Sequence, residues 1–252
     1  MTQNNPAASH FLTAGEDYAK YRPSYPAELV AFIASQCAQH NLAVDVGCGN
    51  GQFSTLLASH FQQVLAIDVS ASQIENAVPV SNIHFAVEPA EQCSAEDASV
   101  NLIVAAQAAH WFDLPRFYKE VRRVAAPDCL LALVSYGVLA IDDSACNTRF
   151  RQFYQNETRP YWPPERQHVD NGYTSIDFPF QELDHPQMTI EREWTLEQFL
   201  GYVRTWSTVK AAAKAGKQNL MENFADQLAS PWGDPQQLRK ISWPIAIRLG
   251  RV

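Results

Sequence analysis

The sequence predicts an α/β fold in which helices cover both faces of a doubly wound, mostly parallel sheet. Between residues 42 and 136, short and nearly continuous apolar runs alternate with amphipathic segments. This alternation is typical of strands that are buried on both faces and separated by helices. A glycine-rich turn follows the first apolar run, as in folds that bind a nucleotide at the carboxyl ends of their strands. The chain has 252 residues, 46% of them hydrophobic, which is enough for one sizeable core or for a core with a small cap.

Each apolar run has a helical neighbour. The spacing of Phe53, Leu56 and Leu57 predicts a helix after the first run, and a similar spacing over 114–124 predicts one before the fifth. Another helix is expected to begin at Pro26, because proline fits the first turn of a helix. The expected strands are 42–46, 64–67, 83–87, 100–106 and 130–135.

The composition changes after the fifth expected strand. Residues 160–186 contain five of the fifteen prolines, so this stretch cannot form one continuous helix. Helices are expected from Thr195 and over 219–229, and 241–249 is predicted to form a terminal strand, in which Pro244 indicates an edge or a bulge. The expected parts of the chain are a core over 1–136, a cap insertion with acceptor-side helices over 137–232, and a strand completing the core sheet over 233–252.

Charge and cysteine usage limit the function classes. With 19 basic and 27 acidic side chains the net charge is −8, which argues against nucleic acid as a partner, because phosphate binding relies on clusters of Lys and Arg. No uncharged run reaches the roughly 18–20 apolar residues of a membrane-spanning helix, and residues 1–10 lack the features of a signal peptide. The five cysteines are scattered, so neither a disulfide framework nor a zinc site is expected. These features predict a cytoplasmic protein with no membrane partner and no metal.

The segment Asp45-Val-Gly47-Cys48-Gly49-Asn-Gly51-Gln52 is the most informative part of the chain. Its glycines allow a tight turn and a close approach of a ligand to main-chain N–H groups. The dinucleotide pattern Gly-x-Gly-x-x-Gly would place its third glycine at position 52, where Gln52 stands instead. Asp45 would repel a pyrophosphate but suits a cationic ligand. The turn therefore favours a ligand with a cationic group over a pyrophosphate.

Asp68 ends the second expected strand, 21 residues after Gly47. A carboxylate at this spacing can accept hydrogen bonds from both hydroxyls of an adenosine ribose. The alternative is a loop carboxylate that caps the next helix, for which Ser70 is another candidate.

On these motifs the chain resembles the class I S-adenosylmethionine-dependent methyltransferases. The segment from Asp45 to Gly51 is similar to their first motif, and Asp68 to their ribose-binding acid. The resemblance covers essentially the whole chain and looks closest to the small-molecule branch that includes trans-aconitate methyltransferase. It implies a seven-stranded, mostly parallel Rossmann-like sheet with a reversed last hairpin and a helical cap insertion. It also implies S-adenosyl-L-methionine as cofactor, S-adenosyl-L-homocysteine as product and a small-molecule acceptor.

The resemblance also assigns roles to residues. Segment 88–91 looks like the adenine-side loop, and segment 107–112 like the segment that lines the sulfonium and the acceptor. Tyr18 and Arg22 would belong to a lid helix over the cofactor. The residues that it implies for the acceptor are Trp111, Arg204 and Trp206. The residues that it implies for the cofactor are Asp45, Gly47, Cys48, Gly49, Gly51, Gln52, Asp68, Val69, Ala90, Glu91, Gln107, Tyr18 and Arg22.

His110 is the candidate catalytic residue, because histidine alone titrates near neutrality without help. A hydroxyl or carbon acceptor would need such a base, whereas a carboxylate acceptor would not. The alternative is that His110 contacts the acceptor or cofactor without moving a proton. Arg149, Arg151 and Arg159 are candidates to meet an anionic acceptor.

Three other functions stay open at this stage. A non-catalytic S-adenosylmethionine-binding protein would keep the same motifs, since methyl transfer requires no obligatory catalytic residue. An RNA-modifying methyltransferase is disfavoured by the net charge of −8. An NAD-binding oxidoreductase is disfavoured by Gln52 and by the lack of a Tyr-x-x-x-Lys proton relay. The acceptor and the oligomeric state are not determined by these patterns.

Overall fold

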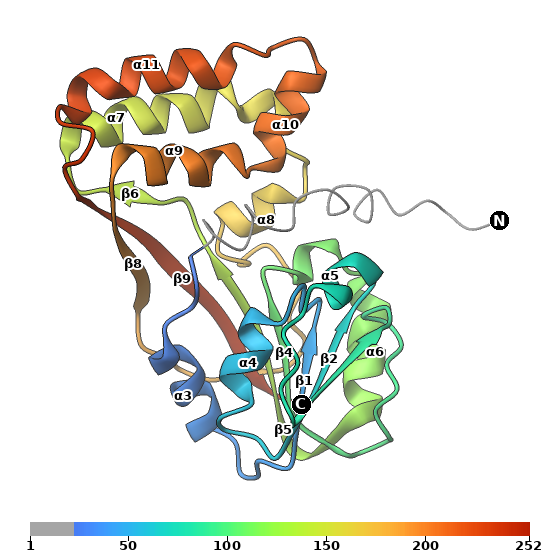
Figure 1. Ribbon diagram of the computed structural model, residues 1–252. Helices are drawn as coiled ribbons and strands as arrows, with labels where there is room; N and C mark the ends of the chain where they lie inside the picture. The colour runs from blue at the N-terminus through green and yellow to red at the C-terminus, as the bar shows by residue number, and fades with distance from the viewer. Residues whose placement is uncertain (1–22) are drawn as a thin grey trace.

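The computed structural model describes residues 23–252, in which an α/β core lies below a helical cap (Figure 1). Long strands connect the two parts. Tyr18 and Arg22, which were expected in a lid, lie outside the described residues. No helix among the described residues is long and apolar enough to cross a membrane.

Five parallel strands form where the apolar runs predict them. They are β1 Leu42–Val46, β2 Gln63–Asp68, β3 Ile83–Val87, β4 Val100–Ala106 and β5 Ala125–Tyr136. Their order in the sheet is β3-β2-β1-β4-β5. Because β1 lies between β2 and β4, the connections that leave β1 and β4 diverge to opposite sides of the sheet. Ligands of such sheets bind in the crevice at this point, beyond the carboxyl ends of the strands.

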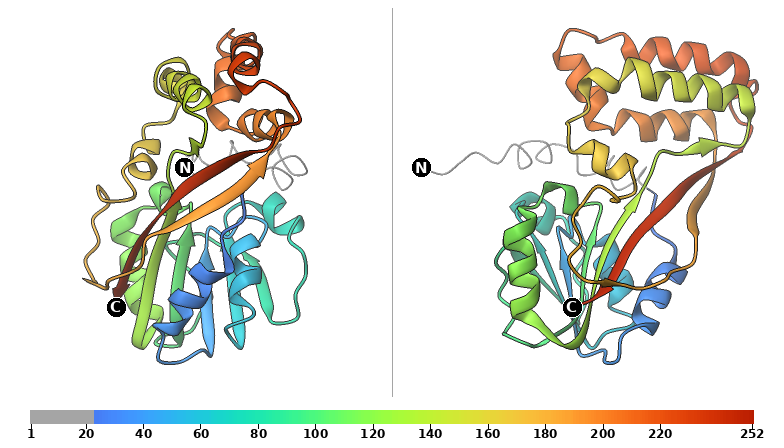
Figure 2. Two further views of the ribbon diagram at one scale, coloured as in Figure 1. Left: turned by 90° about the vertical axis from the view of Figure 1, so that its left-hand side faces the viewer. Right: turned by 180° about the vertical axis from the view of Figure 1, so that it is seen from behind.

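The core helices cover both faces of the sheet, which confirms the predicted doubly wound class. They are α3 Ala27–Ser35, α4 Gln52–Leu57, α5 Ala71–Glu75 and α6 Leu114–Val124, with a short 3₁₀ turn η1 Ala109–Trp111. On one face, Ala43 of β1 belongs to the same buried cluster as Leu29 of α3 and Phe53 of α4. On the other face, the next residue, Val44, clusters with Phe117 of α6. Figure 2 shows α3 and α6 on opposite sides of the sheet.

The C-terminal strand β9 (Arg239–Arg251) lies inside the sheet, so of the two alternatives that Pro244 indicated, an edge or a bulge, the edge is wrong. It runs antiparallel between β5 on one side and β8 (Met188–Trp194) on the other. Pro244 sits where the ladder with β5 ends, and its carbonyl accepts a hydrogen bond from the backbone N–H of Gly137. The N–H and C=O groups of a strand residue point toward the same neighbouring strand. At Pro244 this neighbour is the chain after β5, where the ladder ends, so the N–H that proline lacks is not needed for pairing.

The sheet has nine strands among the described residues, instead of the seven that the resemblance implied. The difference comes from two short strands, β6 (Ala140–Ile141) and β7 (Gln181–Glu182), which pair with β9. Strand β8 also lies within 137–232, the segment expected to form the cap. That segment therefore contributes to the sheet as well as to the cap.

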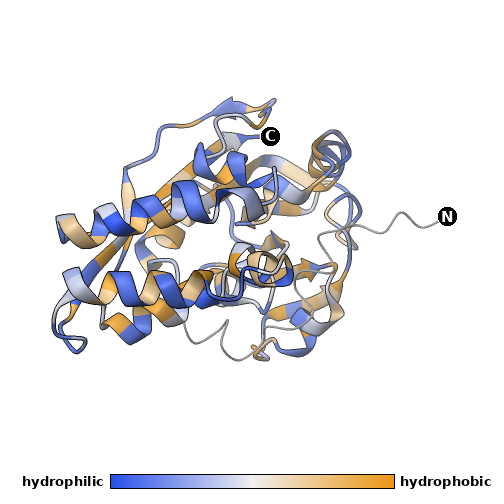
Figure 3. Cartoon of the chain, turned by 90° about the horizontal axis from the view of Figure 1, so that it is seen from above, coloured by the Kyte–Doolittle hydropathy of each residue, from blue (hydrophilic) through white to orange (hydrophobic). Residues whose placement is uncertain are grey.

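The cap consists of two excursions of the chain, one between β6 and β7 and one between β8 and β9 (Figures 1 and 2). Seen from above, its helices carry both apolar and polar residues (Figure 3). The predicted helix start at Thr195 is confirmed by a capping box with Gln198. The cap elements are α7 Ser144–Gln152, a π-helical turn η2 Phe153–Glu157, a 3₁₀ turn η3 Arg159–Tyr161, α8 Arg166–Asp170, α9 Leu196–Arg204, α10 Ser207–Lys214 and α11 Leu220–Trp232.

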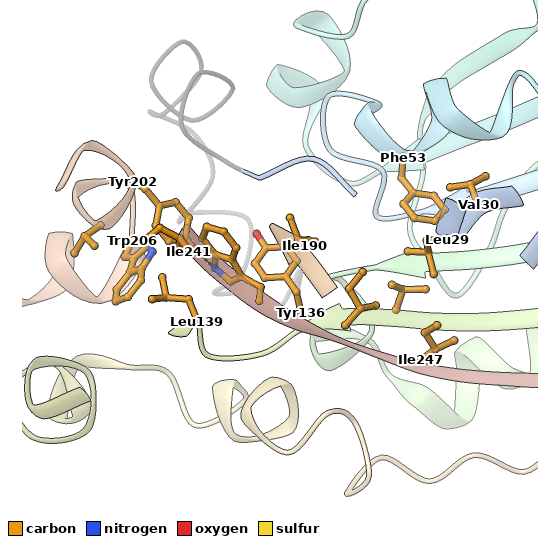
Figure 4. Packing of buried hydrophobic residues seen from close by; sticks show 14 of the residues in the cluster. Leu29, Val30, Phe53, Tyr136, Leu139, Ile190, Tyr202, Trp206, Ile241 and Ile247 are labelled. Carbon is orange, nitrogen blue, oxygen red and sulfur yellow. Dashed lines mark hydrogen bonds between the residues drawn. The ribbon is translucent and has the colours of Figure 1, made fainter. Parts of the chain in front are cut away.

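One hydrophobic cluster connects the core with the cap. It runs from Leu29 and Phe53 in the core, past Tyr136 at the end of β5, to Tyr202 and Trp206 in the cap (Figure 4). Burial of apolar surface is the main stabilising contribution in folding. The shared cluster therefore holds the cap in a fixed position over the carboxyl ends of the parallel strands.

Candidate active site

A cavity of about 190 Å³, here called the core cavity, opens at the carboxyl ends of the parallel strands. It lies at the crevice where the loops after β1 and β4 diverge. The residues predicted for the cofactor that line it are Asp45, Gly47, Cys48, Gly49, Gln52, Asp68, Val69, Ala90, Glu91 and Gln107. Gly51 is not among the lining residues. The structure thus brings together residues from four separate segments of the sequence.

The glycine turn has a backbone that only glycine accommodates without strain. Gly47 has a φ of +71°, and a Cβ at this position would lie 2.5 Å from Cβ of Ala108, in the loop after β4. Gly51 has a φ of +85° and precedes the first residue of α4; a Cβ there would lie 2.7 Å from the ring of Phe85. Gly47 therefore lets the loops after β1 and β4 meet at the cavity floor, and Gly51 lets α4 pack against β3.

Asp68 stabilises the glycine turn and can still accept hydrogen bonds from a ligand. Its Oδ2 accepts a hydrogen bond of 2.9 Å from the backbone N–H of Gly49, and its Oδ1 accepts one of 2.8 Å from that of Ser70. An ionised carboxylate has about four lone-pair sites, so each oxygen can accept one further hydrogen bond. Ser70 precedes α5 as expected, but its hydroxyl interacts with Ser72 and does not cap the helix. Val69 is 50% exposed beside the cavity and offers an apolar surface to a flat ring.

Asp45 is fully buried and has one unmatched oxygen. Its Oδ2 accepts a hydrogen bond of 2.6 Å from the hydroxyl of Ser54, whereas its Oδ1 is buried without a partner among the described residues. Burial raises the pKa of this carboxyl to about 7; the bond from Ser54 opposes the shift and the nearby Asp68 adds to it. A cation in the core cavity would favour the ionised form of Asp45 and give Oδ1 a partner.

The substitution Asp45→Asn should stabilise the ligand-free protein at pH 8 but not at pH 4. The folded-state pKa lies above the ordinary value of 3.8. Between about pH 4 and pH 7 the folded state therefore holds a proton that the unfolded state has lost. The free energy of unfolding falls as the pH rises through this window, on the order of 4 kcal/mol in total for a shift of about three pKa units. The amide does not titrate, so thermal unfolding at pH 8 should give the variant a Tm higher by about 8–16 °C.

The matched control for this measurement is Asp226→Asn, at an exposed position on α11. It should not change Tm at either pH. An equal Tm difference for Asp45→Asn at pH 4 and pH 8 would show that this carboxyl titrates at its ordinary value.

A second cavity of about 310 Å³, here called the cap cavity, adjoins the first between the core and the cap. Four residues line both cavities: Gln73, Gln107, Trp111 and Tyr136. Its walls include His110 and two of the residues that were predicted for the acceptor, Trp111 and Trp206. Arg204 is exposed and lines neither cavity, so the structure does not place this residue at the site.

Gln107 holds a special conformation at the boundary of the two cavities. Its φ of +57° is uncommon for a residue other than glycine. Its backbone N–H donates to the carbonyl of Val134 at 2.8 Å, and its side-chain Nε2 donates to the carbonyl of Tyr136 at 3.0 Å. Backbone conformations of this kind cluster at functional sites, where the surrounding structure holds them in place.

His110 is poorly suited to the role of a general base. Its Nδ1 lies 2.9 Å from the hydroxyl of Tyr173. Burial, with smaller contributions from the charges of Arg166 and His168, lowers its pKa to about 3. Its ring is therefore neutral at pH 7 but only weakly basic. The structure favours the alternative reading, in which His110 contacts a ligand without taking a proton.

Arg166, at the start of α8, is a cavity residue that the sequence reasoning missed. It lines the cap cavity, whereas Arg149 forms an ion pair with Glu157, and neither Arg151 nor Arg159 lines this cavity. No sequence signal distinguishes Arg166 from the other arginines of the cap. Its position depends on the fold of the segment after η3.

No group of His, Cys, Asp and Glu side chains that could hold a metal ion occurs within residues 23–252. Of the five cysteines, Cys37, Cys129 and Cys146 are buried, while Cys48 and Cys93 are partly buried, and none forms a disulfide.

Fold and site together define an α/β protein of the nucleotide-binding class, with a second cavity under a cap. A family model described as a methyltransferase domain matches residues 44–133. A Dictyostelium discoideum protein named as a methyltransferase is 31% identical over 248 residues, which cover 96% of this chain and 94% of that protein. The chain therefore belongs to the class I S-adenosylmethionine-dependent methyltransferases.

Solved structures support the same assignment. A structure from Anaeromyxobacter dehalogenans, titled as a type II methyltransferase, superposes with a TM-score of 0.86 at 40% identity and covers 92% of this chain and 98% of its own. A methyltransferase structure from Anabaena variabilis, with a TM-score of 0.54 at 18% identity over 87% of this chain and 98% of its own, shows the shared fold.

S-adenosylmethionine is the methyl donor of this family, and the core cavity fits it. The unmatched Oδ1 of Asp45 suits the cationic end of the donor. The remaining lone pairs of Asp68 suit a ribose diol. At Gly47 the loops after β1 and β4 lie so close together that a side chain would have no room.

Proposed function

We propose that the protein methylates a small-molecule acceptor held in the cap cavity, and that the methyl group goes to a carboxylate oxygen. The main support is the arrangement of the two cavities. They share Gln73, Gln107, Trp111 and Tyr136, so a donor in the core cavity and an acceptor in the cap cavity would meet at these residues. Holding two reactants in contact in this way contributes much of the rate of a two-substrate reaction.

The lack of a strong base in the lining of the cap cavity, among the described residues, supports a carboxylate as the acceptor. Among the described residues that line it there is no Asp and no Glu, and its histidine, His110, has a pKa lowered to about 3. An acceptor that must lose a proton during transfer would have no effective general base among these residues. A carboxylate is already ionised at pH 7. Bound S-adenosylmethionine supplies a methyl group on a sulfonium, so a carboxylate oxygen forms the new O–C bond while the S–C bond breaks, its electron pair stays on sulfur, and no proton moves.

The residues around the site would then act by positioning and by excluding water. Gln107 and Tyr136 are tied to each other at the boundary of the cavities, so they would align the acceptor with the donor. Trp206 and the other aromatic cap residues would keep water out. We place the protein in the cytoplasm, which the five free cysteines support.

A labelled-methyl assay tests this function on a panel of small carboxylic acids, phenols and amines. We expect transfer from S-adenosylmethionine to at least one acid. With S-adenosylmethionine at a saturating concentration, which keeps Asp45 ionised, the rate should be constant between about pH 6 and pH 8.5, because a carboxylate with a pKa near 4 is fully ionised there and His110 stays neutral. A rate that rises with pH over this range would indicate an acceptor that must be deprotonated. Donor binding without transfer to any class would favour the non-catalytic binding protein.

An RNA-modifying methyltransferase is the second candidate, and the net charge of −8 counts against it. Transfer of the labelled methyl group to RNA in the same assay would support this second function.

A further inference from the structure

We propose that Arg166 binds the charged group of the acceptor, and that the acceptor is a small organic anion with a planar, apolar body. This inference rests on the proposed function in one respect, the placement of the acceptor in the cap cavity. It adds a specificity residue and a ligand class that neither the motifs nor the comparisons supply.

The guanidinium of Arg166 is held in place by one of its three nitrogens. Nε donates hydrogen bonds to the hydroxyl of Tyr154 at 3.0 Å and to Oδ1 of Asp170 at 2.9 Å. These two partners are joined in turn, because the hydroxyl of Tyr154 donates to the same carboxylate oxygen at 2.6 Å. Among the described residues, neither of the two terminal nitrogens has a hydrogen-bond partner. The side chain is only 20% exposed and lines the cap cavity.

Tyr154 lies in the π-helical turn η2, which continues directly from α7. Interruptions of this kind are rare and occur often at functional sites. The turn brings the hydroxyl of Tyr154 to Arg166, so the arginine is oriented from a separate element of the cap. A side chain fixed at Nε presents its terminal N–H groups with little loss of entropy when a ligand binds.

The walls beside Arg166 are aromatic. Its guanidinium carbon lies 4.7 Å from the ring centre of Trp162 and 5.8 Å from that of Tyr154. The ring of Trp162 is 5.6 Å from that of Trp206, which also lines the cavity. Flat side chains of this kind bury large apolar area and pack best against another flat surface. They favour an acceptor whose body is planar and apolar.

Charge decides between an anionic and a cationic ligand. Aromatic walls alone would also suit an ammonium ion, through the negative faces of their rings. The cap cavity, however, is lined by two cationic residues, Arg166 and Lys210, and by no acidic residue among those described. Nε1 of Trp162 is a further buried donor without a partner among the described residues. Walls that hold unmatched donors and positive charge repel a cation and favour an anion.

Neutralisation of the acceptor by methylation would also help product release. A carboxylate and a guanidinium attract each other as opposite charges in addition to their hydrogen bonds, whereas the methyl ester is a neutral acceptor without this attraction. Each product should therefore bind more weakly than the acid from which it formed.

Binding of matched probes to the full chain tests this proposal without requiring methyl transfer. The anions are phenylacetate, trans-cinnamate and indole-3-acetate, the neutral probes are their amides, and the cation is phenethylamine. Each is titrated in the presence of S-adenosylhomocysteine and followed by calorimetry. We expect at least one acid to bind tenfold or more tightly than its amide, and phenethylamine to bind most weakly.

The variant Arg166→Gln should lower the affinity for that acid about ten- to a hundredfold, because hydrogen bonds to a charged group are lost. Its affinity for the amide should change little. The matched control is Arg116→Gln, an arginine at an exposed position on α6, which should bind all probes as the wild type does. If Arg166→Gln loses its native circular dichroism, Arg166→Lys serves instead. This variant keeps the positive charge but lacks the paired terminal N–H groups of arginine, so its affinity for the acid should be about tenfold lower than that of the wild type.

Three results would overturn the proposal: no acid binds at millimolar concentration, phenethylamine binds more tightly than the acids, or the Arg166 variants bind the acid as the wild type does. These binding results and the proposed function can be contradicted independently of each other. If acids bind through Arg166 but accept no methyl group, carboxylate methylation is wrong and the role of Arg166 stands. If acids are methylated with an unchanged KM by Arg166→Gln, the function stands and the role of Arg166 is wrong.

Discussion

The substitution Asp68→Ala is expected to weaken S-adenosylmethionine binding at least about a hundredfold. Two hydroxyls of a ribose would donate to this carboxylate, and hydrogen bonds to a charged group contribute about 1.5–3 kcal/mol each. Their loss corresponds to two or more decades in Kd. The change also removes the acceptor for the backbone N–H groups of Gly49 and Ser70, so the glycine turn would lose part of its support. Isothermal titration calorimetry with S-adenosylmethionine measures the effect.

Two further variants make this result specific. Asp68→Asn keeps one carbonyl oxygen as an acceptor and should lose less affinity than the alanine variant. Asp226→Ala removes a carboxylate from an exposed helix position in the cap and should bind as the wild type does. All three should retain native circular dichroism. Wild-type affinity in folded Asp68→Ala would remove the ribose assignment and leave Asp68 as a residue that only shapes the turn.

The substitution Gly47→Ala is expected to damage both folding and donor binding. A residue other than glycine at a φ of +71° costs about 1–2 kcal/mol. The new Cβ would lie 2.5 Å from Cβ of Ala108, and relief of such an overlap in a packed site costs about 1–3 kcal/mol. Together these amount to about 3 kcal/mol, which lowers Tm by about 6–12 °C. Because the overlap pushes the loops after β1 and β4 apart, donor affinity should fall more than tenfold.

Gly216→Ala separates the two contributions. Gly216 has a φ of +83° but nothing within 4 Å of the position of a Cβ, so the variant has the conformational cost without the overlap. It should lose about half as much stability or less and should keep donor affinity. If both variants lowered Tm equally, the contact with Ala108 would be irrelevant to the site.

The parallel strands and the residues that line the core cavity could be predicted from the sequence because their signals are local. A strand buried on both faces must be apolar at nearly every position, so the runs that form β1 to β4 stand out within a residue or two of their observed ends. The turn at Gly47 and the acid at Asp68 lie at fixed distances along the chain from the strands that carry them. The residues that line the core cavity were identified for the same reason.

The lining of the cap cavity could not be predicted in this way. Arg204 and Arg166 both belong to the cap, yet one is exposed and the other lines the cavity. Their sequence neighbourhoods do not separate them. The orientation of Arg166 depends on Tyr154 and Asp170, which reach it from η2 and from the far end of α8.

The class of fold, the glycine turn and the acid that faces it follow from the order of residues alone, since each depends on the residue types of one strand and the loop that follows it. Three features became apparent only from the folded chain: β9 lies inside the sheet, His110 is partly buried beside Tyr173, and a cation and aromatic rings meet in the cap cavity. These depend on contacts between segments distant in the chain, where packing chooses among many side chains of the same type.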